Sequence, residues 1–229
     1  DVPTCIARGT LLAAMTGAVD PRDALVVSER CGAGSLKTLP EGARIGTGSM
    51  RRISQLRAFR RDLHFEPVRG NLDTRLRKLD ELGLDAIVVA GAGLCRLGLA
   101  SRIAEWIDPE ICLPAPGQGI LVIQVRSKDK FAAEVAASLE DREARLRATA
   151  ERAFLARLGA GCTVPVGSYA GLDPSNQVIR LKGVVASPDG DRLLKDSCEG
   201  SAEDPAAVGE RLAERMLAAG AGELLDGDG

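Results

Sequence analysis

A regular alternation of short apolar runs and amphipathic segments, between about residues 24 and 112, most constrains the fold of this chain. Continuous apolar runs are typical of strands buried on both faces of a parallel sheet, and leucines recur at helical spacing between the runs. The order strand–helix–strand predicts an α/β architecture with right-handed crossovers. We expect strands over residues 43–46, 63–68 and 85–90, and helices over residues 49–60 and 71–82.

Residues 113–119, Leu-Pro-Ala-Pro-Gly-Gln-Gly, interrupt this alternation. Two prolines and two glycines within seven residues predict a crossover or a hinge rather than a regular element. A strand is expected directly afterwards, over residues 120–126, and helices near 130–139 and 142–158.

The pattern changes after residue 162. An alternating run over 178–186 predicts a strand, the sequence Ser-Pro-Asp-Gly at 187–190 predicts a turn, and a second strand is expected to pair back. A helix is predicted from about 205 to 219. These elements indicate a small α+β domain with an antiparallel sheet.

Composition and charge narrow the classes of function. The 229 residues have an ordinary globular composition, with 45% hydrophobic and 27% charged residues. A net charge of −2 gives no general attraction to nucleic acid or to an anionic membrane, and no apolar run reaches the roughly 18 residues of a membrane span. Six cysteines without a Cys-x-x-Cys pair, beside the single His64, favour neither a zinc site nor a Cys–His catalytic pair, so no metal is expected. Scattered thiols without a secretory signal pattern favour the cytoplasm.

Residues 46–52, Gly-Thr-Gly-Ser-Met-Arg-Arg, stand where a predicted strand ends and a helix begins. Free backbone N–H groups at a helix N-terminus attract anions, and Arg51 and Arg52 add forked donors for carboxylates. The segment is neither a Walker loop nor a dinucleotide fingerprint, because the required Lys and the third Gly are missing. The alternative is a helix cap with two solvated arginines.

A second junction of this kind follows at residues 68–75, where Arg69 and Arg75 again flank a strand-to-helix turn. Arg96 comes after the third predicted strand. Ligands of open α/β sheets bind beyond the carboxyl ends of the strands. Each arginine alone is typical of a surface charge, but several at successive strand ends favour a site for a compound with several carboxylates.

Cys162 lies in a glycine-rich segment, Gly-Ala-Gly-Cys-Thr-Val-Pro-Val-Gly at 159–167, between a predicted helix and a predicted strand. Taken alone, the segment favours an unmodified cysteine at a domain entry, because free Cys mostly behaves as a small hydrophobe. A thiol that carries a bulky covalent group would also need such an open loop.

Several segments resemble the porphobilinogen deaminase (hydroxymethylbilane synthase) family in the same order along the chain. They include Thr-Ala-Glu-Arg-Ala-Phe-Leu at 149–155 with the Cys162 segment that follows it, and both arginine junctions. Three further stretches agree: Asp-Pro-Arg-Asp-Ala-Leu at 20–25, Leu-Gly-Leu at 97–99, and residues 113–119. The resemblance runs from Asp1 nearly to the C-terminus.

The resemblance implies a reaction and the residues that perform it. Family members join four porphobilinogens head to tail, release ammonia and produce linear hydroxymethylbilane. Cys162 would hold a dipyrromethane cofactor through a thioether, and Asp1, which matches the aspartate of the family motif Lys-Asp-Val-Pro, would be catalytic. Contacts with cofactor or substrate carboxylates are expected from Thr47, Ser49, Arg51, Arg52, Arg69, Gly70, Asn71, Arg75, Arg96 and Gln118.

The resemblance also implies the domain organisation. A periplasmic-binding-protein-like (type II) α/β domain over 17–119 and a C-terminal α+β domain over 138–229 are expected, with 1–16 and 120–137 as remnants of a first domain. Because the family has further sequence before the Asp1 position, the chain is expected to lack most of that first domain. The family is usually monomeric. A non-catalytic carboxylate-binding module and an inactive fragment of the enzyme are the alternatives.

Overall fold

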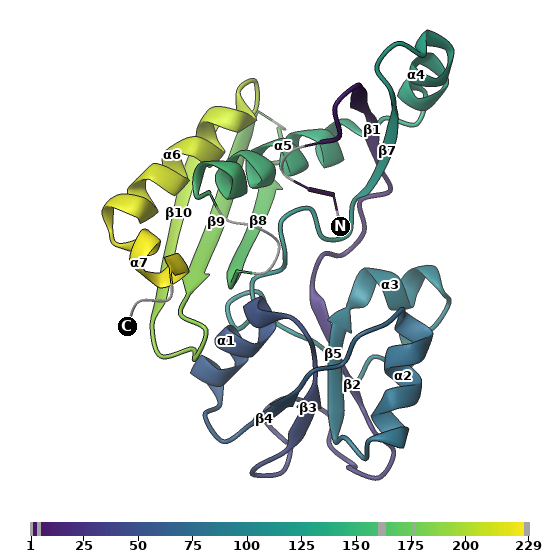
Figure 1. The fold of residues 1–229 in the computed structure, drawn as a ribbon, viewed down its shortest axis with the longest axis vertical. Coiled ribbons are helices and arrows are strands. Elements are labelled where there is room, and N and C mark those ends of the chain that lie inside the picture. Colours follow the sequence, from purple (N-terminus) through teal and green to yellow (C-terminus); the bar gives the residue numbers. More distant parts are fainter. Residues whose placement is uncertain (1, 4–5, 160–163, 176, 227–229) are drawn as a thin grey trace.

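Three β-sheets joined by extended crossover segments make up the described part of the fold (Figure 1). The computed structural model describes residues 2–3, 6–159, 164–175 and 177–226. Figure 1 shows a five-stranded unit at the bottom, a three-stranded unit with long helices at the upper left, and a two-stranded ribbon at the upper right. The mixed α/β architecture predicted from the sequence is confirmed.

The five-stranded sheet has the order β4-β3-β5-β2-β6. Its strands are β2 (Asp23–Val27), β3 (Arg44–Gly46), β4 (His64–Glu66), β5 (Ala86–Ala90) and β6 (Glu105–Trp106). The prediction of a parallel sheet is correct for β3, β4 and β5. The sequence pattern predicts no strand at residues 23–27, and β2 there runs antiparallel to both β5 and β6, because it enters from the ribbon rather than through a strand–helix–strand unit.

Helices cover both faces of this sheet, which explains the continuous apolar runs in its strands. On one face Leu25 packs with α1 (Met50–Phe59). On the other face Ala24 and Val26 pack with α2 (Leu72–Glu81) and α3 (Gly91–Arg96). The short 3₁₀ helix η1 (Ala100–Arg102) leads into β6. The predicted helices and strands of this unit are therefore confirmed, within a few residues at their ends.

The ribbon pairs β1 (Thr10–Thr16) antiparallel with β7 (Leu121–Arg126), and α4 (Lys130–Ala137) lies at its tip. Two crossover segments, 17–22 and 113–120, connect the ribbon to the five-stranded unit. They are hydrogen-bonded to each other, because Val19 N donates to Gly119 O at 3.2 Å. Gly119 has φ +87°, and a Cβ there would lie 2.6 Å from the carbonyl oxygen of Val19, so only glycine fits. The predicted crossover at 113–119 is confirmed.

The C-terminal unit is the antiparallel sheet β10-β9-β8 with helices on one face. Phe154 of α5 and Leu212 of α6 are fully buried against this face. No helix among the described ranges is both long and apolar enough to cross a membrane. The elements are α5 (Arg142–Arg157), β8 (Val166–Leu172), β9 (Val178–Ala186), β10 (Leu193–Ser201), α6 (Pro205–Ala218) and α7 (Ala221–Asp226).

Candidate functional site

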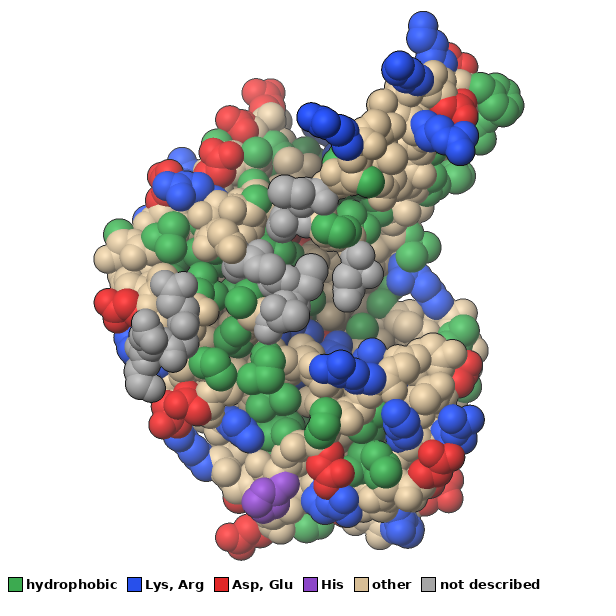
Figure 2. Space-filling model, viewed as in Figure 1, with side chains coloured by type: hydrophobic (Ala, Val, Ile, Leu, Met, Phe, Trp, Pro, Cys, Tyr) green, Lys and Arg blue, Asp and Glu red, His purple; other side chains and the backbone are tan. Residues whose placement is uncertain are grey.

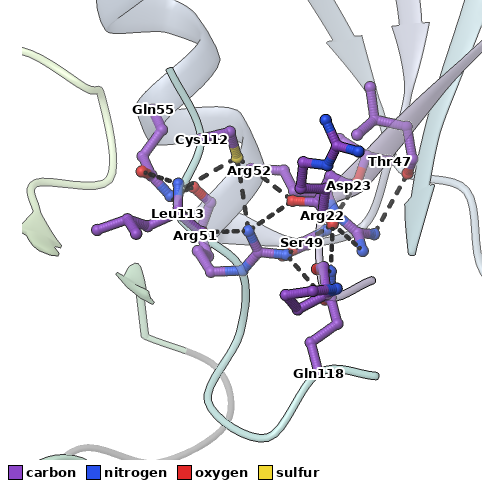
Figure 3. A network of polar contacts seen from close by, with 12 residues as sticks. Arg22, Asp23, Thr47, Ser49, Arg51, Arg52, Gln55, Cys112, Leu113 and Gln118 are labelled. Atoms are coloured by element: carbon purple, nitrogen blue, oxygen red, sulfur yellow. Dashed lines mark hydrogen bonds and ion pairs between the residues drawn. The ribbon is translucent and has the colours of Figure 1, made fainter. Parts of the chain in front are cut away.

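A buried carboxylate, Asp23, is the centre of a network of polar contacts (Figure 3). It is the first residue of β2 and is fully buried. Arg51 donates to it from Nη1 at 2.7 Å and from Nη2 at 3.2 Å. Arg52 donates from Nε at 3.0 Å and from Nη2 at 2.9 Å, and Gln118 donates from Nε2 at 2.8 Å. We call Asp23, Arg51, Arg52 and Gln118 the Asp23 cluster.

The charges of the Asp23 cluster stabilise one another. Burial alone would raise the pKa of Asp23, but Arg51 and Arg52 outweigh burial and hold it well below its ordinary value of 3.8. The stabilisation is therefore present above the ordinary pKa and is lost as the pH falls through the lower pKa of the folded state. Two guanidiniums share one carboxylate, so the cluster keeps one positive charge in excess. Such an excess favours an anionic ligand.

The start of the second crossover segment, at Leu113, is fixed to α1 beside the Asp23 cluster. Arg51 donates to Leu113 O at 2.6 Å, and Gln55 accepts a hydrogen bond from Leu113 N at 2.9 Å. The buried Cys112 thiol donates to Asp23 at 3.4 Å. Burial raises the pKa of Cys112 to about 12, so this group is a neutral thiol at physiological pH.

The residues before α1 present polar groups next to the Asp23 cluster. Thr47, buried after β3, accepts a hydrogen bond from Ser49 N at 3.3 Å. Ser49 occupies the N-cap position, and its side chain makes no capping hydrogen bond to any described residue. The start of α1 therefore keeps N–H and hydroxyl groups available to an anion.

The second arginine junction lies against the first. A Cβ on Gly48 would contact Arg69 Cγ at 3.6 Å, so the stem of the exposed Arg69 passes the start of α1. Arg75 is half-buried and donates to Gly70 O at 2.8 Å. Burial lowers the pKa of Arg75, and the charge of Arg52 lowers it further, which places the two guanidiniums in one electrostatic field.

Asn71 and Arg96 have structural partners of their own. Asn71 caps α2, because its Oδ1 accepts from Thr74 N at 2.9 Å. The exposed Arg96 donates through Nη2 to Gly17 O at 2.9 Å and to Gly119 O at 2.8 Å. Arg96 therefore holds the two crossover segments together and lies outside the Asp23 cluster.

The structure brings most of the predicted binding residues to one edge of the five-stranded sheet. Figure 2 shows Lys and Arg side chains along a hollow between the ribbon and the five-stranded unit. A separate cavity of about 470 Å³ is lined by Asp20, Arg22, Arg147 and Tyr169, among others, and by no member of the Asp23 cluster. Asp1 and Cys162 lie outside the described residues.

The sequence patterns do not single out Asp23 or Cys112. The available signal for Asp23 is a carboxylate at the start of an otherwise apolar strand, Asp-Ala-Leu-Val-Val. An acidic residue in such a position needs a buried counter-charge. The tandem arginines, which the sequence suggests as free donors for a ligand, supply that counter-charge in the structure. Among the residues that the structure describes, no group of His, Cys, Asp and Glu could hold a metal ion.

An α/β unit of the type II periplasmic-binding class with arginines at one edge of its sheet, followed by a small α+β unit, agrees with the comparisons with known proteins. The family model described as "Porphobilinogen deaminase, dipyromethane cofactor binding domain" matches residues 1–134, and "Porphobilinogen deaminase, C-terminal domain" matches residues 145–218. The chain belongs to the porphobilinogen deaminase family, a family of transferases.

Curated relatives agree over nearly the whole chain. A porphobilinogen deaminase of Roseiflexus sp. (strain RS-1) is 46% identical over 99% of this chain and 73% of the relative. Those of Pelotomaculum thermopropionicum and Deinococcus radiodurans are 47% and 45% identical, over 98% and 99% of this chain and 70% and 72% of the relatives.

The buried carboxylate gives a test of the network's energetics. Asp23→Asn should lower the free energy of unfolding by about 3–5 kcal/mol, because it leaves two buried guanidiniums without a counter-charge. Urea unfolding at pH 7 measures this difference.

Asp20→Asn is the matched control. Asp20 pairs with Arg22, and both side chains are more than a third exposed. Its replacement should change the free energy of unfolding by less than about 1 kcal/mol. Equal losses for the two variants would contradict the role of Asp23.

Proposed function

We propose that this protein is a hydroxymethylbilane synthase of tetrapyrrole (porphyrin, heme) biosynthesis. It joins four porphobilinogens head to tail, releases ammonia and yields linear hydroxymethylbilane. The observation that supports this most directly is the Asp23 cluster, with one positive charge in excess, beside the open N-terminus of α1. The family membership of the chain supports the same function.

The described residues fit a compound with several carboxylates. Each porphobilinogen carries an acetate and a propionate, so the growing chain accumulates negative charge. Arg51 and Arg52 provide the buried positive charge, while Arg69 and Arg75 add guanidiniums at its rim. The contacts with cofactor or substrate carboxylates are assigned to Thr47, Ser49, Arg51, Arg52, Arg69, Gly70, Asn71, Arg75, Arg96 and Gln118.

We assign cofactor attachment to Cys162. In the sequence, its segment connects α5 to β8. Dipyrromethane, when bound, supplies the pyrrole position that substrate units extend. Loss of ammonia from porphobilinogen leaves an electrophilic methylene, and a thiolate is a good nucleophile for such a carbon.

We assign the catalytic carboxylate to Asp1. A carboxylate beside the pyrrole nitrogens would stabilise the positive charge that develops on the ring as ammonia leaves. It would also assist the proton transfers that accompany carbon–carbon bond formation.

The domain organisation and the setting are part of the proposal. Residues 17–119 form the binding domain, 138–229 the cofactor-attachment domain, and 1–16 with 120–137 the remainder of a first domain. We propose that the part of the relatives outside the match contains most of this first domain. The enzyme is proposed to act as a cytoplasmic monomer, without nucleic acid or a membrane as partner.

Cofactor attachment can be tested directly. In the full-length protein, peptide mapping by mass spectrometry should find a dipyrromethane adduct on Cys162, and Cys162→Ser should remove it while the Asp23 cluster stays folded. An adduct on Cys95 or Cys112 instead would refute the assignment.

The arginine edge predicts a difference between two single substitutions. Arg69→Leu should weaken binding of a non-reactive pyrrole dicarboxylate by about 1.5–3 kcal/mol, the range of a hydrogen bond to a charged group. Arg215→Leu is the control, since Arg215 pairs with Asp196 on the surface of the C-terminal unit. Calorimetric titration gives both affinities, and equal effects would mean that the arginines act only through general stability.

The catalytic assignment predicts a loss of turnover without a loss of cofactor. Asp1→Ala in the full-length protein should remove nearly all hydroxymethylbilane formation, because the developing positive charge loses its partner. The adduct on Cys162 and the affinity for the pyrrole dicarboxylate should remain. Steady product formation by this variant would require a different catalytic residue.

A further inference from the structure

A second buried carboxylate, Glu151 of α5, connects two units of the fold. It is 2% exposed. Oε2 accepts a hydrogen bond from Gly117 N at 2.5 Å, and Oε1 accepts one from Ala170 N at 2.7 Å. Gly117 belongs to the crossover and Ala170 to β8, so a single side chain joins both segments to α5.

Two backbone N–H groups facing one side chain require two acceptors. A carboxylate provides two acceptor oxygens, whereas a glutamine of the same shape would direct an NH₂ donor at one of the N–H groups. A buried N–H without a partner is strongly unfavourable. The geometry at Glu151 is therefore specific for an ionised acid.

We call the two hydrogen bonds of Glu151, to Gly117 and Ala170, the Glu151 bridge. Its Gly117 end lies next to a member of the Asp23 cluster. Gly117 has φ +77° in the turn of the crossover, and the next residue is Gln118. Gln118 donates through Nε2 to Asp23 at 2.8 Å and to Pro21 O at 2.6 Å. The position of the Gly117 backbone thus determines where Gln118 meets Asp23.

The other end of the bridge fixes the elements on both sides of Cys162. The helix α5 ends at Arg157, shortly before that cysteine, and β8 begins at Val166, shortly after it. Glu151 of α5 accepts this hydrogen bond from Ala170 of β8, and so it joins the helix before Cys162 to the strand after it.

We propose that Glu151 is a positioning residue that holds the Asp23 cluster at a fixed place relative to α5 and β8, the elements that flank Cys162 in the sequence. This inference rests on the proposed function. A cofactor attached at Cys162 reaches the arginines only if the two lie at the correct separation. Small errors in such a placement strongly reduce the rate of the reaction.

The protonation state of Glu151 gives this proposal a measurable signature. Burial raises the pKa of Glu151 to about 7, against the two backbone N–H groups and Arg147, which lower it. Arg147 of α5 is the charged side chain that acts on Glu151, while the crossover and β8 contribute backbone N–H groups from the described residues. Above about pH 7 the carboxylate of Glu151 accepts a hydrogen bond from each of the two N–H groups. Below that pH the hydroxyl of the protonated acid is a poor acceptor for one of them.

The contribution of Glu151 to folding stability falls as the pH rises, whereas its two hydrogen bonds to backbone N–H groups become stronger. A carboxyl whose pKa is higher in the folded state than in the unfolded chain favours folding when it is protonated. Its contribution is fully present below the ordinary pKa of 4.5 and is lost as the pH rises to about 7. Positioning therefore improves over a pH range in which stability falls, which separates this role from a merely structural one.

The experiment compares wild type and Glu151→Gln in the full-length holoenzyme. The variant should retain the dipyrromethane adduct by mass, raise KM for porphobilinogen by about tenfold through the lost placement, and lack the decline of kcat/KM below pH 7. Glu210→Gln, at an exposed position of α6 away from Arg147, is the matched control and should match wild type. A variant with the KM and pH profile of wild type would overturn the proposal.

Amide hydrogen exchange gives a readout that does not depend on activity or on the variant. In wild type, exchange at residues 115–119, corrected for its intrinsic pH dependence, should become about tenfold faster between pH 8 and pH 6 as the bridge opens. Unchanged protection would refute the bridge, even if Glu151→Gln does not fold. Absence of an adduct or of product in wild type would refute the proposed function instead, without affecting this measurement.

Discussion

The placement of two guanidiniums against one fully buried carboxylate governs the arrangement of this molecule. Asp23 can be buried only because Arg51 and Arg52 reach it from α1, and they can be buried only because Asp23 receives them. This mutual requirement fixes α1 over β2. The antiparallel placement of β2 between β5 and the edge strand β6 puts the carboxylate beside the crossover. The same constraint leaves one unneutralised positive charge near the start of a helix, where anions bind well.

Polar contacts of the crossovers connect this charge centre to the rest of the protein. Gln118 joins Asp23 to the second crossover, and Arg96 joins the second crossover to the first. Glu151 connects the second crossover to the C-terminal unit. The contacts of Arg96 and Glu151 use backbone groups of the crossovers, whereas the contact with Asp23 uses the Gln118 side chain. The arginine edge of the five-stranded sheet and the C-terminal unit are thus connected by a few hydrogen bonds across an irregular segment.

Local periodicity was sufficient to predict most of the helices and strands, the crossover at 113–119 and the antiparallel C-terminal sheet, but it did not indicate β1, β2, β6, α3 or α7. It could not predict the direction of β2, which depends on a distant connection to the ribbon. Local periodicity also could not predict which residues far apart in the sequence pair with each other. Arg51 could be recognised as an anion binder, but its partner Asp23 lies 28 residues away. Arg96 has a recognisable strand-end position, while its two carbonyl partners are set by how the crossovers pass each other. Glu151 sits in a recognisable motif, yet its partners lie 34 and 19 residues away.

The hydrogen bond from Cys112 to Asp23 has a consequence for chemical selectivity. A site that is proposed to handle electrophilic methylene groups contains a thiol in contact with its main anion-binding arginine. An ionised thiol in that position would compete for the electrophile. Burial and the adjacent carboxylate keep Cys112 protonated, with a pKa of about 12, and so remove its nucleophilicity. The network that is proposed to bind the substrate's carboxylates thereby also protects its own sulfur from alkylation.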